Sequence, residues 1–82
     1  MEKIEKTIEE LSLSLMYLTR FEERVGSGTA VWAWKGYPFS AIDSLVEKDY
    51  IDTKPRNKSA YLTESGIAKA KELLSKYGIN DA

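Results

Sequence analysis

Residues 50–66 read Tyr-Ile-Asp-Thr-Lys-Pro-Arg-Asn-Lys-Ser-Ala-Tyr-Leu-Thr-Glu-Ser-Gly, and this stretch decides the fold. It holds two short segments of strand-forming residues, 50–53 and 59–62, which flank a polar turn at 55–58 that begins with proline. This pattern predicts a two-stranded hairpin. Thr63 follows the second segment and is placed to cap the start of a helix.

Helices are predicted on both sides of this hairpin. After it, apolar residues recur at helical spacing up to Gly78, a natural helix stop. Before it, a short helix is expected over about residues 39–48. The predicted buried residues are Phe39, Ile42, Leu45 and Val46 in the first of these helices, and Ile67, Ala70, Leu73, Leu74 and Tyr77 in the second.

The N-terminal third of the chain predicts a long helix and one strand. Helical spacing extends over residues 2–24, and Gly26-Ser27-Gly28 is interpreted as the stop. Residues 30–34 (Ala-Val-Trp-Ala-Trp) then predict a strand with both tryptophans on one side and small residues on the other.

Two separate apolar strips mark the first helix. The first consists of Ile4, Ile8, Leu11, Leu15 and Leu18, and the second of Leu13, Tyr17 and Phe21. A helix with two such strips must be covered on both sides, and a chain of 82 residues has little material to do so. We therefore expect a homodimer, and we assign Leu13, Tyr17 and Phe21 to its helix interface.

The order helix, strand, helix, hairpin, helix predicts a single α+β domain over residues 1–82. A helix followed directly by a two-stranded hairpin is typical of winged-helix domains, in which the hairpin forms the wing. A second short helix would normally precede the helix at 39–48, so an atypical winged-helix-like, helix-turn-helix-like fold is predicted.

Two short motifs carry a family resemblance. Ala33-Trp34-Lys35-Gly36 and, further on, Leu62-Thr63-Glu64-Ser65-Gly66 together resemble a family of small, mainly bacterial proteins of unknown function. In that family an Ala-Trp-Lys-Gly motif precedes a Leu-Thr-Glu-x-Gly motif. The resemblance implies a winged-helix-like fold and a bacterial origin, and it implies no reaction.

Charge favours nucleic-acid binding only locally. Twelve Lys and Arg against thirteen Asp and Glu give a net charge of −1, so the chain has no overall basic character. Against a groove-reading role, Asp43 and Glu47 lie on the expected outer side of the helix at 39–48. The alternative is a solvated hairpin tip whose like charges discourage pairing with other sheets. The candidate DNA contacts are Lys54, Arg56 and Lys58 on the wing, with Lys35 and Lys48 beside them.

Four aromatic residues within eight positions form a second candidate site. Trp32, Trp34, Tyr37 and Phe39 could stack on nucleobases or on a planar ligand. The alternative is a core or subunit-interface cluster, because each ring buries about 150–250 Å².

Several classes of function are not expected. The chain has no Cys and no His, which excludes a disulfide framework, a Cys/His zinc site and a Ser-His-Asp triad within it. No enzyme activity, metal or cofactor is predicted. The longest apolar runs are far shorter than the roughly 20 residues of a membrane span, and no apolar signal core follows the first residues. A cytoplasmic protein without membrane contact is expected.

Two hypotheses remain open at this point. The first is a non-catalytic winged-helix-like module that binds nucleic acid or regulates transcription. The second is a homodimeric protein-interaction or scaffold module that does not bind DNA.

Overall fold

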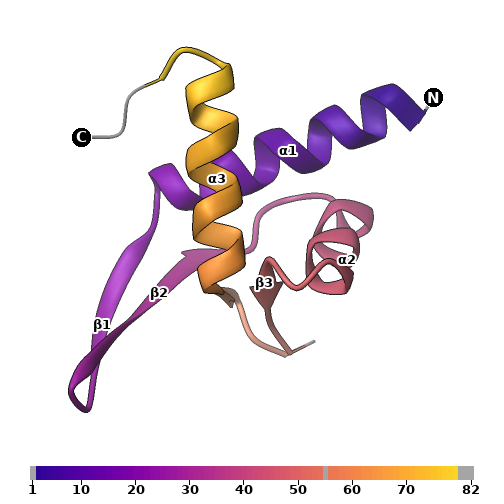
Figure 1. The fold of residues 1–82 in the computed structure, drawn as a ribbon. Helices are drawn as coiled ribbons and strands as arrows, with labels where there is room; N and C mark the ends of the chain where they lie inside the picture. The colour runs from indigo at the N-terminus through magenta and orange to yellow at the C-terminus, as the bar shows by residue number, and fades with distance from the viewer. Residues whose placement is uncertain (1, 55, 80–82) are drawn as a thin grey trace.

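The computed structural model describes residues 2–54 and 56–79, and in these ranges three helices accompany a four-stranded antiparallel sheet (Figure 1). This confirms the α+β prediction. The sheet order is β1-β2-β4-β3. No helix in the described ranges is long and apolar enough to cross a membrane. The elements are α1 (Glu2–Leu18), β1 (Phe21–Val25), β2 (Gly28–Trp34), α2 (Phe39–Glu47), β3 (Ile51–Asp52), β4 (Ser59–Leu62) and α3 (Glu64–Lys76).

The first helix is shorter than predicted, because residues 21–25 form strand β1 instead of a last helical turn. Phe21 pairs with Trp32 and Val25 with Gly28 in the β1–β2 hairpin, which extends well beyond the helices (Figure 1). Gly26-Ser27 is therefore a hairpin turn before Gly28, the first residue of β2, and not a helix stop. Gly26 has a φ of +58°, the sign that a type II′ turn requires at its first central position.

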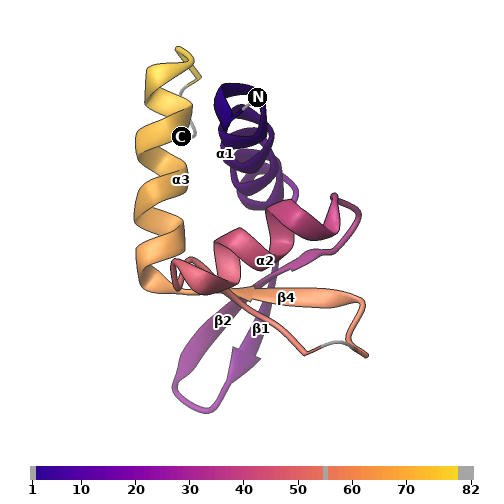
Figure 2. The same ribbon diagram turned by 90° about the vertical axis from the view of Figure 1, so that its right-hand side faces the viewer.

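The core lies between the three helices and one face of the sheet (Figure 2). Along each strand, alternate residues point to opposite faces. The predicted alternation in β2 is confirmed, because Ala33 is completely buried while Trp34 on the opposite face is 62% exposed. The buried core consists of Leu13, Met16, Tyr17, Ala33, Ile42, Leu45, Ile51, Ala60, Leu62, Ala70, Leu73 and Leu74.

The two other predicted helices are confirmed, but their buried faces differ in part. In α2 the core side is formed by Ala41, Ile42 and Leu45. Phe39 and Val46 lie beside this face of the short helix, and Phe39 is 86% exposed. In α3, Ala70, Leu73 and Leu74 are buried as predicted. Tyr77 follows the last helical turn and is exposed.

The Leu-Thr-Glu-x-Gly segment fastens α3 to the turn that follows α2. The Thr63 side chain caps α3 as predicted, by accepting a hydrogen bond from the Gly66 N–H (3.0 Å). Its hydroxyl donates to the carbonyl oxygen of Asp49 (2.6 Å). Gly66 lies so close to the Tyr50 carbonyl that a Cβ at this position would overlap it. Glycine is therefore required here for packing. Of the predicted turn at 55–58, Pro55 lies outside the described residues.

Candidate functional site

One side of α1 is apolar and exposed along the length of the helix. Five aliphatic residues lie on this side, and each is between 40% and 56% exposed. We call them the α1 strip. Their spacing of four, three, four and three residues is the a/d pattern of a coiled-coil seam. The α1 strip consists of Ile4, Ile8, Leu11, Leu15 and Leu18.

The second strip of α1 has the opposite environment, which corrects the predicted interface. Leu13 is 1% and Tyr17 is 5% exposed, and both pack in the core together with Met16. Phe21 is outside the helix on β1 and is 36% exposed. Leu13 and Tyr17 are thus occupied by this chain's own core, and among the described residues the apolar surface of α1 that stays exposed is the α1 strip.

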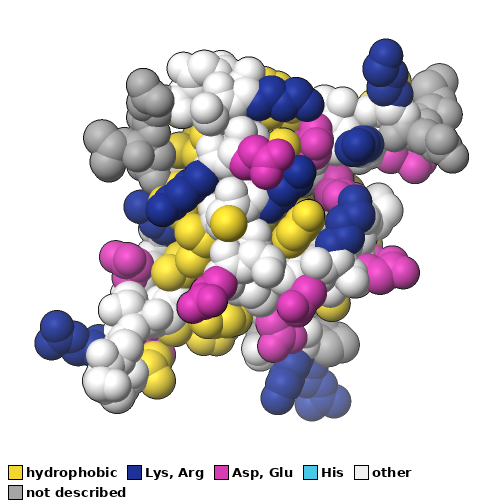
Figure 3. All heavy atoms as spheres, viewed as in Figure 1, with side chains coloured by type: hydrophobic (Ala, Val, Ile, Leu, Met, Phe, Trp, Pro, Cys, Tyr) yellow, Lys and Arg dark blue, Asp and Glu magenta, His cyan; other side chains and the backbone are white. Residues whose placement is uncertain are grey.

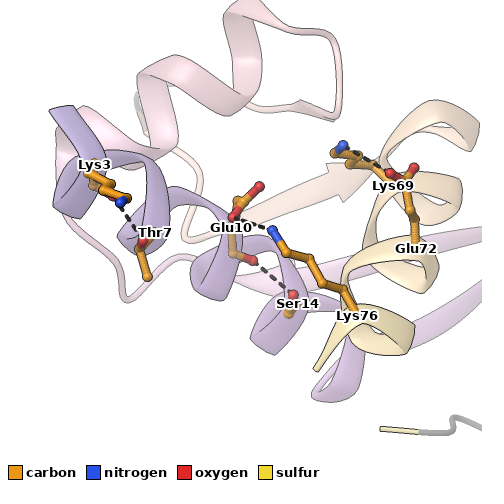
Figure 4. A network of polar contacts seen from close by, with 7 residues as sticks. All are labelled: Lys3, Thr7, Glu10, Ser14, Lys69, Glu72 and Lys76. Carbon is orange, nitrogen blue, oxygen red and sulfur yellow. Dashed lines mark hydrogen bonds and ion pairs between the residues drawn. The ribbon is translucent and has the colours of Figure 1, made fainter. Parts of the chain in front are cut away.

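The borders of the α1 strip are polar but already hydrogen-bonded. Ser12 donates its hydroxyl to the Ile8 carbonyl (2.6 Å) and Ser14 to the Glu10 carbonyl (2.8 Å). Thr7 and Thr19 likewise donate their hydroxyls to the carbonyl oxygens of Lys3 and Leu15, four residues earlier. Figure 4 shows the hydrogen bonds made by Thr7 and Ser14. Covering the strip would therefore leave these hydroxyls with their partners.

A buried carboxylate joins α1 to α2. Glu9 is 9% exposed, accepts a short hydrogen bond from the Ser44 hydroxyl and pairs with the Lys48 ammonium (2.6 Å). Burial raises the pKa of Glu9, but the hydrogen bonds from Lys48 and Ser44 outweigh it and leave this pKa below its usual value. The bond to Glu9 raises the pKa of Lys48. Lys48 is therefore engaged in holding two helices together.

A weaker link joins α1 to α3. The Lys76 ammonium lies 4.0 Å from the Glu10 carboxylate (Figure 4). With Glu9 bonded to α2 and Leu13 in the core, α1 is fixed on the sides away from the α1 strip. The strip is thus presented on a helix that is already formed and held in place.

The predicted aromatic cluster is divided among three places. Trp32 and Trp34 lie on the sheet face that points away from the core, and Tyr37 is half-buried against the core. Phe39 is exposed at the start of α2. Gly36, between these aromatic residues, has open space where a Cβ would stand.

Two further rings join the tryptophans on the outward sheet face. The rings of Phe21 and Trp34 are 5.1 Å apart, and those of Trp32 and Tyr61 are 5.7 Å apart in an edge-on arrangement. Trp32 Nε1 is buried and has no hydrogen-bond acceptor among the described residues. We call Phe21, Trp32, Trp34 and Tyr61 the aromatic face. Sequence reasoning missed Phe21 and Tyr61, because the strand register that unites them is set by pairing between distant residues.

The five candidate nucleic-acid contacts lie at two places, with Lys48 against α1 and the other four at or beside the segment between β3 and β4. Lys48 is paired with Glu9, and the Lys35 ammonium donates to Thr53 Oγ1 (3.1 Å) and to the Lys54 carbonyl (3.2 Å). In Figure 3, Lys and Arg side chains occur in separate groups with carboxylates between them. We call the exposed residues Lys54, Arg56 and Lys58, between β3 and β4, the basic loop.

The hollows of the surface differ in their lining, and one of them is mainly apolar. One of about 320 Å³ lies beside α2, where Asp43 and Lys35 border the apolar side chains of Phe39 and Val46. Among residues 2–54 and 56–79, no group of three or more acidic side chains is arranged to hold a metal ion. In these ranges, the two exposed surfaces with several large apolar side chains are the α1 strip and the aromatic face.

Comparison with known proteins gives a family but no characterised relative. The sequence profile of a family described as Domain of unknown function (DUF6429) matches residues 4–80, which is nearly the whole chain. The chain belongs to this family. The expected membership in a family of unknown function is confirmed, whereas the winged-helix likeness remains a prediction for this DUF6429 protein. No curated protein and no solved structure matches it.

Proposed function

We propose that this DUF6429 protein is a non-catalytic interaction module that pairs with a second copy of itself through the α1 strip. The observation that carries the proposal is the exposure of all five aliphatic side chains at heptad spacing. A contiguous apolar strip of this kind marks an interaction site more often than a solvated surface. Since the strip repeats its own pattern along the helix, an identical strip is a complementary partner.

The energy available from the α1 strip is of the size that a dimer needs. Complete burial of an aliphatic side chain contributes about 1.5–3 kcal/mol. Five roughly half-exposed side chains on each of two copies therefore supply about 7–15 kcal/mol. Association costs about 4–15 kcal/mol in lost freedom of motion. The two ranges overlap, so burial of the strip can offset the cost of association, and a weak, reversible dimer is expected.

The rest of the molecule favours pairing in two ways. A helix of 17 residues is marginal by itself, but α1 is already held by the core, so pairing does not have to form it. The hydroxyls along the strip from Thr7 to Thr19 are bonded within the helix, which lowers the desolvation cost. These two features support self-association over a merely exposed surface helix.

Substitution within the strip tests the proposal. Leu11→Glu combined with Leu15→Glu places two charges on each copy in the middle of the strip, and both positions are exposed in a single chain. We expect this variant to stay monomeric at concentrations about 100-fold above those at which the unmodified protein pairs, since burying unpaired charges is costly. The measurement is sedimentation velocity over a concentration series.

The matched control is Phe39→Ser, which removes an even more exposed apolar side chain outside the strip and should leave pairing unchanged. Circular dichroism verifies that each variant keeps its helices. Pairing of the double variant at the unmodified protein's concentrations would refute the proposal.

A second candidate function is contact with duplex DNA through the basic loop. The order α2, β3, β4, α3 and the position of β4 between β2 and β3 support a winged-helix likeness, although residues 35–38 before α2 form a loop. The engagement of Lys48 with Glu9 and of Lys35 with Thr53 leaves three of the five predicted cations for this role. We therefore rank it below pairing.

A further inference from the structure

We infer that the aromatic face binds single-stranded nucleic acid, with bases stacked on Trp34 and its neighbouring rings and phosphates directed to the basic loop. This site is separate from the α1 strip and does not depend on pairing. Four rings from three adjacent strands share one face of the sheet, because cross-strand partners point to the same side. Trp34 is 62% exposed although its ring packs beside that of Phe21, so a large part of this residue is accessible to a ligand.

The charge around the aromatic face suits a strand with a negatively charged backbone. The central strands β2 and β4 place only uncharged residues on this face from Ala30 to Trp34 and from Ser59 to Tyr61. The carboxylates of Glu23 and Asp52 also belong to this face, but they lie on the outer strands β1 and β3. An uncharged path thus runs over the middle of the sheet.

The basic loop lies at one end of this path. The Lys35 N–H, which follows Trp34 directly, donates to the carbonyl oxygen of Lys58 (2.9 Å). Ser59, next to Lys58, is the cross-strand partner of Trp34. Residues 53–59 contain three cations and no acid. A strand that stacks a base on Trp34 therefore meets positive charge within one or two residues.

The rings select for unpaired bases rather than for a duplex or a protein. Stacking on an aromatic side chain requires a free base face, which single strands expose and duplexes do not. Adjacent strands are about 4.8 Å apart. The rings on three adjacent strands therefore cover a width that can hold two or three bases. A protein partner would use the rings but would gain less from the cluster of cations beside them.

The test measures binding of labelled oligonucleotides by fluorescence anisotropy. The probes are a dT and an rU strand of about ten nucleotides, a duplex of about 20 base pairs, and inorganic polyphosphate as a polyanion without bases, each at about 50 and 200 mM salt. We expect the single strands to bind more tightly than the duplex and to resist competition by polyphosphate. The tighter of the two single strands then shows whether the DNA or the RNA probe is preferred.

Variants separate stacking from simple charge attraction. Trp34→Ala should weaken single-strand binding about tenfold, while Trp34→Phe, which keeps a ring, should recover most of it. Arg56→Gln with Lys58→Gln should weaken binding at low salt and flatten its salt dependence. Phe39→Ala, which removes an exposed ring outside the aromatic face, should change nothing.

Three results would overturn the inference: no binding of either single strand at about 50 mM salt, equal binding of duplex and single strand, or unchanged binding by Trp34→Ala. The variant Leu11→Glu/Leu15→Glu distinguishes the two sites, because it should lose pairing and keep oligonucleotide binding.

Discussion

Both sides of α1 carry large apolar residues, yet one side is buried and the other is exposed. The buried side holds Leu13, Met16 and Tyr17, and it also carries the charged residue Glu9. The exposed α1 strip holds five aliphatic residues and no charge. The side with the cleaner apolar pattern is therefore the one that the chain leaves uncovered.

This difference shows that apolar spacing identifies a helix face that can be covered. The spacing does not say whether the chain's own elements or another molecule cover it. Within the chain, the partner of the buried side is the sheet together with α2 and α3, and Glu9 is accommodated because Ser44 and Lys48 bind it. For the α1 strip we propose a second copy. Substitutions on the two sides of α1, and in the elements packed against its buried side, test this contrast.

The largest contrast is expected between truncations on the two sides of the helix. Leu13→Ala should lower the free energy of unfolding by about 2–5 kcal/mol, because it removes a side chain that is 1% exposed and leaves a cavity. Leu11→Ala, two residues earlier, should change the stability of the monomer by less than about 0.5 kcal/mol. Urea denaturation at low protein concentration measures both, and equal losses would contradict the contrast.

A smaller loss is expected where α3 is seated on the buried side. Gly66→Ala should cost about 1–3 kcal/mol, because its Cβ would overlap the Tyr50 carbonyl and move the start of α3. Gly36→Ala is the matched control, since nothing lies within 4 Å of its Cβ position and little change is expected. A stable Gly66→Ala protein would show that the Leu-Thr-Glu-x-Gly segment does not fasten α3.

The smallest of the three effects concerns the charge on the buried side. Glu9→Gln should cost about 1–2 kcal/mol at neutral pH, because Lys48 is half exposed and can return to solvent. The pKa of Glu9 is lowered by folding, so its contribution is present above its ordinary value of 4.5 and is lost as the pH falls through the lowered pKa.

The stability difference between the unmodified protein and Glu9→Gln should therefore shrink on acidification below about pH 4.5 in thermal unfolding experiments. The raised pKa of Lys48 keeps that partner charged throughout this range. A difference that stays constant down to pH 3 would mean that the ionised carboxylate is not what stabilises the α1–α2 contact.

Local signals in the sequence were enough for part of the fold. The Thr63 cap, the α3 stop at Gly78 (φ +76°), α2 and strand β4 follow from spacing and from residues with fixed conformational preferences. Strand β1 does not, because Phe21 continues the helical spacing from Tyr17 while its strand is formed by pairing with β2. A turn signal at Gly26-Ser27 between two runs with strand character could have revealed the hairpin.

The candidate sites were predictable to a lesser degree. Both strips of α1 are evident in the sequence, but which of them is buried depends on packing against elements far along the chain. Likewise, Trp32 and Trp34 share a face by strand alternation, whereas Phe21 and Tyr61 join them only through the register of three strands. Non-local pairing is thus what the sequence pattern leaves undetermined.

The central claim is that the α1 strip binds a second copy, and the mass of the unmodified protein in solution tests it most directly. Sedimentation equilibrium from low to high micromolar concentration should show a mass that rises from the 9.3 kDa of one chain toward twice that value. A mass that remains at 9.3 kDa at the highest concentration would contradict the claim. It would mean that a second copy of the chain does not bind the α1 strip.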